Sequence, residues 1–495
     1  MTPLGGGPGG RVVASAAGAA WSGAAGFALV TVITHGLPVA DAGAVLTGIA
    51  LATVLAAACC AGADTGMIWL LPRLGAPGDR RAGVRSATGR TVVLSAVAAV
   101  VLVVVACWGA GVLPGTHGTA VLVVVAAVLP VLVASTVLVA TVRGLDRLPL
   151  YIALQFGVLP TGRLVGVALA LAVGGGVAAA LAGWGAAAAV TLVVAALAAR
   201  ALTAGTGSGA RARARVVRSL WRFCRPRAVS SVIDASAGWV GVLLVSVLAG
   251  AAAAARFGAV SRCALAGLLV MQAVRVATGA QFSALLREDD VAAAGRLYRA
   301  STRWIVAVSW PFFGLVAAYP VTVLGVFGRE YRSAAAALVV VVAAMAVNTA
   351  CGNAQTVLLM SGDSRRHLLA TVSGLATTVV GDVALVPHLG VLAAAAAWAA
   401  GIVVENALVL GWVVRRVGVA PLDRASVVLL AVLLGAVAPA LVTVRWAAGP
   451  GWASLVLAGA TSVAVLGLCL GGAWRLRAPG AQAVAVSGAR RSLRG

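Results

Sequence analysis

Polar and charged side chains interrupt several long apolar stretches of this 495-residue chain. Arg163 follows Pro160 in one stretch, and Arg275 lies in another. Gln272 and Thr278 are three residues from Arg275, so they share its face of a helix. Arg presents a planar fork of N–H donors that matches phosphate and carboxylate oxygens. The pattern predicts an anion-binding site; the alternative is an interhelical ion pair or a side chain that extends to water.

Arg262 is a weaker candidate for the same site. It precedes Arg275 by 13 residues, which at about 100° per residue turns the two side chains roughly 220° apart. Both would face one cavity only if the helix bends between them.

Acidic residues also lie in apolar surroundings, namely Asp64, Asp234, Asp382 and Glu405. Carboxylates at membrane depth are costly and relay ions in many transporters. Asp234, Asp382 and Glu405 are therefore predicted as coupling sites for a proton or sodium ion, with a salt bridge to Arg as the alternative. Asp64 is expected to be structural, at the end of a helix.

The composition requires lipid around these residues. The chain is 62% hydrophobic and 10% charged, whereas a soluble domain is about half apolar and about a quarter charged. Apolar runs of about 20 residues without two-residue alternation favour membrane helices over barrel strands. We therefore predict an all-α polytopic membrane protein.

Division at charged and Gly/Pro clusters predicts fourteen spans. They cover approximately residues 14–34, 43–62, 91–113, 119–142, 151–173, 177–199, 229–250, 258–286, 304–327, 333–360, 368–386, 391–414, 425–444 and 452–474.

The net charge of +24 is carried by Arg, because the chain contains no Lys. Roughly 30 Arg fall after even-numbered spans and about 4 after odd-numbered ones, as the positive-inside rule describes. The basic charge therefore indicates topology and attraction to anionic membrane lipids, not nucleic-acid binding. Both termini are expected in the cytoplasm and the chain in the cell membrane.

The spans suggest two related halves. Six spans in residues 1–200 precede a basic cytoplasmic linker at 201–228, and six more occupy 229–416. Helices 13 and 14 occupy 417–474, before a basic cytoplasmic tail at 475–495. Each half has an Arg, an apolar run and then a Gly-Ala-Val, at Gly43 and Gly258. Repeats of this kind are common in transporters, with the substrate path between them.

Several other chemistries are excluded or disfavoured by composition. Seven Cys and four His are scattered without metal-ligand spacing, so no metal site is expected. Without Lys there is no phosphate-binding loop for ATP, and no cofactor is predicted. A membrane glycosyltransferase or polymerase is disfavoured because the outer loops are short and Asp41 is a lone acid. We therefore do not expect an enzyme.

Five short motifs occur in the order typical of one family. They are Gly62-Ala63-Asp64-Thr65-Gly66, Trp221-Arg222-Phe223 with Pro226, Phe327-Gly328-Arg329-Glu330-Tyr331, Leu359-Met360-Ser361-Gly362, and Pro387-His388-Leu389-Gly390 with Ala393 to Ala397. With these motifs the chain resembles, over nearly its whole length, the polysaccharide and oligosaccharide-lipid flippases of the multidrug/oligosaccharidyl-lipid/polysaccharide exporter superfamily.

The resemblance implies two six-helix bundles around a central cavity, plus two C-terminal helices. It departs from the family pattern in three places. Met67 follows the first motif where many members carry Arg, Asp382 stands where Asn is frequent, and Gly241 where Asp is frequent.

The resemblance implies a flippase that moves a polyprenyl-diphosphate-linked oligosaccharide from the inner to the outer leaflet by alternating access, for cell-surface polysaccharide biosynthesis. Arg275, Arg163, Gln272 and Arg262 would then bind the substrate. The alternative is an ion-coupled exporter of small amphiphilic molecules in the same superfamily. The membrane Arg residues argue against cationic drugs as substrates, because like charges repel.

Overall fold

The computed structural model describes residues 8–108, 117–204, 209–419 and 423–469. Within these residues every element is a helix. The first eight α-helices are α1 (Pro8–Gly36), α2 (Val39–Cys60), α3 (Ala63–Leu70), α4 (Pro77–Trp108), α5 (Gly118–Gly144), α6 (Leu148–Ile152), α7 (Leu159–Ala172) and α8 (Val177–Leu202). A short π-helix, η2 (Ala153–Val158), joins α6 to α7.

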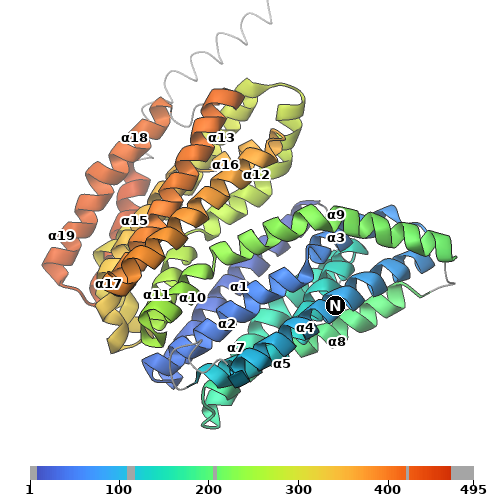
Figure 1. Cartoon of the computed structure of the whole chain (residues 1–495). Helices are drawn as coiled ribbons and strands as arrows, with labels where there is room; N and C mark the ends of the chain where they lie inside the picture. The colour runs from blue at the N-terminus through green and yellow to red at the C-terminus, as the bar shows by residue number, and fades with distance from the viewer. Residues whose placement is uncertain (1–7, 109–116, 205–208, 420–422, 470–495) are drawn as a thin grey trace, which may run out of the picture.

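The remaining α-helices begin with α9, which packs against α3 and α4 of the first bundle. They are α9 (Ala210–Ala237), α10 (Val240–Ala249), α11 (Ala251–Ala266), α12 (Leu269–Arg287), α13 (Val291–Ala318), α14 (Pro320–Leu324), α15 (Ala335–Ala350), α16 (Ala354–Met360), α17 (Ser364–Trp412), α18 (Arg424–Val432) and α19 (Ala438–Ala448). A last helix covers Trp452–Cys469. The two bundles meet around α1, α2, α10 and α11 and spread apart from there (Figure 1).

The outer faces of the helices are apolar, as a lipid environment requires. Along α4, Val93, Val97, Val100 and Val104 are each about half exposed or more, at three- and four-residue spacing. Ten helices of the described part are long and apolar enough to cross a membrane, or twelve if each of two bent pairs is one span. The all-helical membrane fold is thus confirmed, whereas the count of fourteen stays a prediction.

The count differs in part because two predicted spans fall within α17. Gly390 has φ 57° and ψ −134°, outside the helical region. Gly374 approaches the carbonyl of Gly401, and Gly381 approaches Ala397, so the two arms of α17 lie antiparallel. The predicted spans 368–386 and 391–414 correspond to these two arms.

Two other helices also break within a predicted span. The axes of α11 and α12 differ by 48°, and that of α13 differs by 85° from the segment that follows it. Helix α9 begins at Ala210, so part of the predicted linker 201–228 is helical. Gly238 and Trp239 then separate α9 from α10 inside the predicted seventh span.

The bundles are in direct contact at the start of α2 and α11. A Cβ on Gly43 would lie 1.8 Å from the carbonyl oxygen of Ala251, so only Gly fits there. Close by, the Thr47 hydroxyl donates to the Ser246 hydroxyl at 3.0 Å. We call this contact the Gly43 end, and it is closed in the structure.

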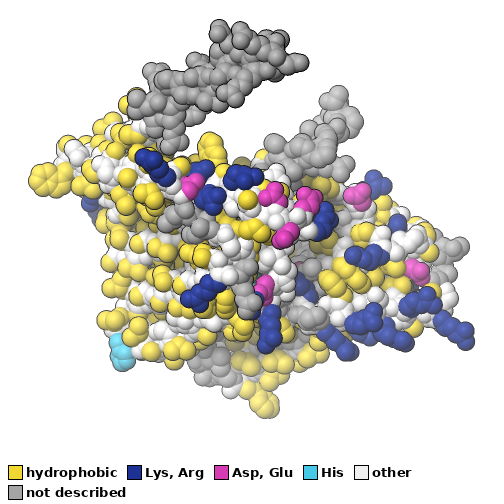
Figure 2. Space-filling view, turned by 90° about the horizontal axis from the view of Figure 1, so that it is seen from above, with side chains coloured by type: hydrophobic (Ala, Val, Ile, Leu, Met, Phe, Trp, Pro, Cys, Tyr) yellow, Lys and Arg dark blue, Asp and Glu magenta, His cyan; other side chains and the backbone are white. Residues whose placement is uncertain are grey.

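The opposite end of the first bundle carries a dense group of Arg. Helices α3 and α9 pack closely there, because Gly66 has no Cβ and so leaves room for the Cys224 thiol of α9. Trp221 donates to the Ser86 hydroxyl of α4 at 3.1 Å, and the Arg90 guanidinium lies 5.1 Å from the Trp221 ring. We call this the Arg-rich end. Seen from above, Figure 2 shows dark blue Arg side chains across the surface, most densely at the lower right of the view, and yellow apolar side chains over the left flank.

Helix α18 is fastened to α13 through one carboxylate. Asp423 caps α18 by accepting from the Ser426 backbone N–H at 2.8 Å, and Arg303 of α13 donates to it at 2.6 Å. Burial raises the pKa of the Asp423 carboxyl, but hydrogen bonds from Ser426 and Arg303 outweigh burial and lower the pKa to about 2.

We expect Asp423→Ala to lower thermal stability, because the cap contributes about 1 kcal/mol and the partly exposed ion pair about 0.2–1 kcal/mol. The pKa is depressed in the folded state, so this contribution is fully present above about pH 4 and is lost as the pH falls through about 2. Intrinsic Trp fluorescence during heating in detergent, from pH 7 down to 2.5, measures the difference.

Asp363→Ala is the matched control for that prediction. Asp363 also caps a helix, but its Arg partner, Arg366, lies on the same helix. An equal loss in both variants would show that the link from α18 to α13 contributes nothing.

Candidate functional site

A cavity of about 220 Å³ lies where α1, α2, α7 and α8 face the second half of the chain. Arg163 of α7 and Arg262 of α11 both line it, together with Thr53 and two Trp. We call it the inter-bundle cavity. Within the described part of the chain, no carboxylate is among its lining residues.

Arg163 is held against an aromatic ring. Its guanidinium carbon lies 4.4 Å from the centre of the Trp184 ring of α8. The π-helical turn η2 ends just before Pro160, whose ring would clash with the preceding turn of a regular helix. Stacking on Trp fixes the plane of the guanidinium and leaves its N–H edge free to donate. Nε of Arg163 is buried and has no hydrogen-bond partner among the described residues.

Arg262 has the same arrangement on the other side of the cavity. Its guanidinium carbon lies 4.2 Å from the centre of the Trp239 ring. Trp239 occupies the break between α9 and α10, where Gly238 ends the preceding helix. Two Arg–Trp stacks from the two halves of the chain therefore border one cavity, an arrangement suited to a multiply charged anion.

A second cavity, of about 360 Å³, adjoins the first on the side of the Arg-rich end. It shares Arg163 and Thr53 with the inter-bundle cavity. Arg227, Asp64 and Gln155 also line it. We call it the first-bundle cavity, and Arg163 is where the two cavities meet.

Arg275 and Gln272 lie elsewhere, on α12 beyond the break after Ala266. Gln272 is exposed. One guanidinium nitrogen of Arg275 is 3.6 Å from the Met271 sulfur, and its charge interacts favourably with the Glu405 carboxylate. Neither residue lines the inter-bundle cavity. The described structure thus brings Arg163 together with Arg262, and not with Arg275.

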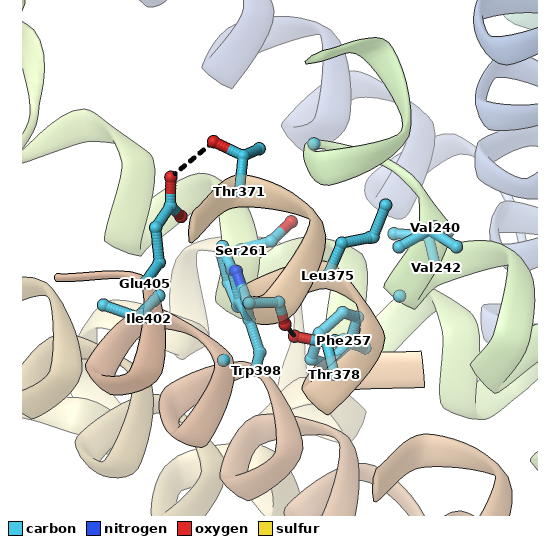
Figure 3. A pocket seen from close by; sticks show the side chains of 14 residues that line it. Val240, Val242, Phe257, Ser261, Thr371, Leu375, Thr378, Trp398, Ile402 and Glu405 are labelled. Atoms are coloured by element: carbon cyan, nitrogen blue, oxygen red, sulfur yellow. Dashed lines mark hydrogen bonds between the residues drawn. The ribbon is translucent and has the colours of Figure 1, made fainter. Parts of the chain in front are cut away.

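Glu405 borders a small pocket between α10, α11 and the two arms of α17, shown in Figure 3. Its carboxylate accepts from the Thr371 hydroxyl at 3.0 Å and from the Gln355 amide at 3.1 Å. The pocket volume is about 60 Å³, and Arg is absent from its lining in the described part of the chain.

The other two predicted coupling residues differ in what surrounds them. Asp382 on α17 is fully buried, and neither carboxylate oxygen has a hydrogen-bond partner among the described residues. An isolated charge is costly in such a place, which favours the protonated carboxyl. The side chain of Asp234 lies outside the described residues. Asn406, beside Glu405 in sequence, donates to the Asn348 side chain at 3.1 Å.

Glu405→Gln distinguishes a structural ion pair from a coupling site. If the negative charge of Glu405 mainly stabilises the Arg275 guanidinium, the substitution leaves that guanidinium without its counter-charge and costs about 1–3 kcal/mol of stability. We expect the stability to recover in Glu405→Gln/Arg275→Gln, measured as a double-mutant cycle of unfolding temperatures in detergent. Unchanged stability together with loss of dependence on a pH or sodium gradient would instead identify a coupling site.

Sequence reasoning missed three parts of this arrangement. The sequence pattern assigns no role to Trp184 or Trp239, and it places Arg227 only in the basic linker and at the start of the apolar run of the second half. A signal for Arg227 was available, because it is the last Arg before that apolar run. The Trp partners had no such signal, since their contacts join separate helices.

The comparisons with known proteins agree with this architecture. Residues 77–336 match the model of the family described as polysaccharide biosynthesis protein, and the chain belongs to this family. No curated protein matches the chain by sequence.

Solved structures similar to this chain include a flippase and multidrug transporters. One is lipid II flippase MurJ in an inward closed conformation, with TM-score 0.70, 8% identity, and coverage of 94% of this chain and 99% of that one. An inward-facing multidrug resistance MATE family transporter of the MOP superfamily gives TM-score 0.64, 14% identity, and coverage of 80% and 94%. An outward-facing MATE family transporter of the same superfamily gives TM-score 0.55 and 17% identity, and the match covers 84% of this chain and 97% of that one. The predicted superfamily fold is confirmed, and these relatives are transporters and flippases, not enzymes.

Proposed function

We propose that the protein flips a polyprenyl-diphosphate-linked oligosaccharide from the inner to the outer leaflet of the cell membrane, for cell-surface polysaccharide biosynthesis. The sugar and diphosphate would occupy the cavities, and the polyprenyl chain would stay in the bilayer. The pairing of Arg163 and Arg262 across one cavity is the observation that carries this proposal. A diphosphate offers each fork its own phosphate oxygens.

Alternating access is supported by the closure at the Gly43 end. Besides the Gly43–Ala251 contact, the Phe27 and Phe327 rings pack 5.1 Å apart between the two halves. In the proposed orientation the Arg-rich end and both termini are cytoplasmic, so the structure would be a state closed to the outside. Residues 1–200 and 229–416 would move as the two bundles, with 417–474 as the additional helices.

Transport in proteoliposomes tests the proposal. We expect the wild-type protein to flip a fluorescent polyprenyl-diphosphate oligosaccharide faster than the same sugar on a polyprenyl monophosphate, because the monophosphate satisfies one Arg fork less well. Folded protein that flips neither lipid would overturn the proposal.

Arg275 and Gln272 remain separate candidates on α12. Loss of transport in Arg275→Ala, with stability retained, would add that helix to the substrate path.

An ion-coupled exporter of small amphiphiles is the second candidate, favoured by one observation. The Glu405 carboxylate borders a small pocket and accepts from the Thr371 hydroxyl and the Gln355 amide, and an intramembrane carboxylate of this kind suits a proton, a sodium ion or a cationic group. Efflux of small cations that Glu405→Gln abolishes and Arg262→Gln leaves unchanged would decide in favour of this function.

A further inference from the structure

Helix α9 carries a straight row of Arg on its first half. Arg211, Arg215, Arg218, Arg222 and Arg225 follow one another at spacings of three and four residues, and all are exposed. At about 100° per residue the row stays within an arc of roughly 80° and extends about 21 Å along the helix. We call it the α9 row.

The opposite face of α9 is fixed to the first bundle. Val216, Leu220 and Cys224, also at four-residue spacing, are buried there. Leu220 and Cys224 fill the space above Gly66, and Val216 reaches Gly83 of α4. Because this apolar face is anchored, the α9 row has a fixed direction away from the bundle.

The row leads to an open pocket at the Arg-rich end. Its volume is about 470 Å³, and its lining residues are Trp69, Ser219, Arg222, Phe223, Arg227 and Ser230. Trp69 and Phe223 are stacked 4.5 Å apart at 7° and form an apolar wall. Arg227 donates to the Ser230 hydroxyl at 3.0 Å. Two cations, hydroxyl groups and an aromatic wall are the features that bind a phosphate joined to an apolar group.

Shared residues connect this pocket to the candidate site. Arg227 lines both the open pocket and the first-bundle cavity. Arg163 lines both the first-bundle cavity and the inter-bundle cavity, which ends at Arg262. Arg227 and Arg163 therefore stand at the boundaries between neighbouring cavities, in order from the surface to the site between the bundles.

We propose that the pocket formed by Trp69, Ser219, Arg222, Phe223, Arg227 and Ser230 is a separate vestibule site for the diphosphate group. There the α9 row captures the anionic substrate before Arg227 and Arg163 pass it inward. This inference rests on the proposed function for its substrate. The chemistry it requires is a phosphate anion, which either the lipid-linked diphosphate or an anionic phospholipid headgroup presents. A row of like charges concentrates such an anion near the opening.

Thiol labelling tests the vestibule without requiring transport. Ser219→Cys places a thiol in the pocket, and Cys107→Ser removes an exposed native thiol. In nanodiscs of neutral lipid, we expect a negatively charged methanethiosulfonate to react roughly tenfold faster than a positively charged one. Added inorganic pyrophosphate should slow the reaction. Arg222→Gln should weaken both effects, whereas Arg81→Gln, an exposed Arg of α4 outside the α9 row, should retain them in full.

The outcomes separate the vestibule from the proposed function. Labelling that is indifferent to reagent charge and to pyrophosphate would overturn the vestibule even if transport is observed. Protection by pyrophosphate without transport of any lipid-linked sugar would keep the vestibule and reject the flippase. Equal protection by phosphatidylglycerol and by polyprenyl diphosphate in the nanodisc would mean a site for structural lipid, and would overturn the capture role.

Transport kinetics supply the second measurement. Arg222→Gln should raise the KM for the diphosphate substrate about three- to tenfold and weaken its dependence on salt, with the maximal rate unchanged. Loss of maximal rate with an unchanged KM would contradict a capture role.

Discussion

Gly43→Val is expected to prevent closure of the bundles at the Gly43 end and to abolish transport. A Cβ there would lie 1.8 Å from the Ala251 carbonyl oxygen, on the backbone of the facing helix. Backbone cannot turn aside as a side chain can, and overpacking costs about 1–3 kcal/mol or more. A penalty of that size shifts a two-state equilibrium about fivefold to 150-fold toward the state open at this end.

A cross-link across the same contact measures that shift. Thr47 and Ser246 donate and accept at 3.0 Å in the closed state, so Thr47→Cys with Ser246→Cys should form a disulfide on oxidation. We expect the cross-link to form at least tenfold more slowly with Gly43→Val added.

Gly89→Val on α4 is the matched control, because a Cβ on Gly89 meets nothing within 4 Å. Equal cross-linking and transport in the wild type, Gly43→Val and Gly89→Val would show that a larger side chain at Gly43 does not prevent closure at this contact.

Arg262→Gln is expected to lower the transport rate of a diphosphate-linked substrate by roughly 10- to 150-fold, because a hydrogen bond to a charged group contributes about 1.5–3 kcal/mol. Arg262→Lys should recover only part of the rate, since an ammonium group lacks the planar fork and stacks less well on Trp239. The measurement is the initial rate of flipping at saturating and at low substrate, with protein folding checked by unfolding temperature.

The pairing of Arg262 with Arg163 predicts how the effects of substituting both residues combine. If both forks hold one diphosphate, the effects of Arg163→Gln and Arg262→Gln should not be additive in free energy. Arg287→Gln, at the exposed end of α12, is a control with the same loss of charge. Additive losses, or an equal loss with Arg287→Gln, would show that the two Arg do not bind one anion.

Much of the fold was predictable because a bilayer imposes a local, one-dimensional constraint. Each span needs about 20 apolar residues with its backbone hydrogen bonds satisfied internally, and such runs are visible in sequence. Arg163 stood out for the same reason, as an ionisable residue inside such a run. The similarity of the Gly43 and Gly258 segments pointed to related helices, and α2 and α11 do pack together.

The cavity that Arg262 faces could not be predicted from spacing along the sequence. A uniform 100° per residue relates side chains only along an unbroken helix. The helix does bend, by 48° between α11 and α12, but the bend does not bring Arg275 to the cavity that Arg262 lines beside Trp239. The sequence could state that a bend was needed, but not where it would point the two side chains.

Composition and hydropathy by themselves determined the class of protein and the residues worth testing, because burial in lipid acts on each segment separately. The tertiary structure alone decided which of those residues meet. It joined Arg163 to Arg262, placed Glu405 near Arg275, and anchored α9 so that its row of Arg leads to Arg227. These contacts depend on packing between helices far apart in the chain, and no local pattern encodes that packing.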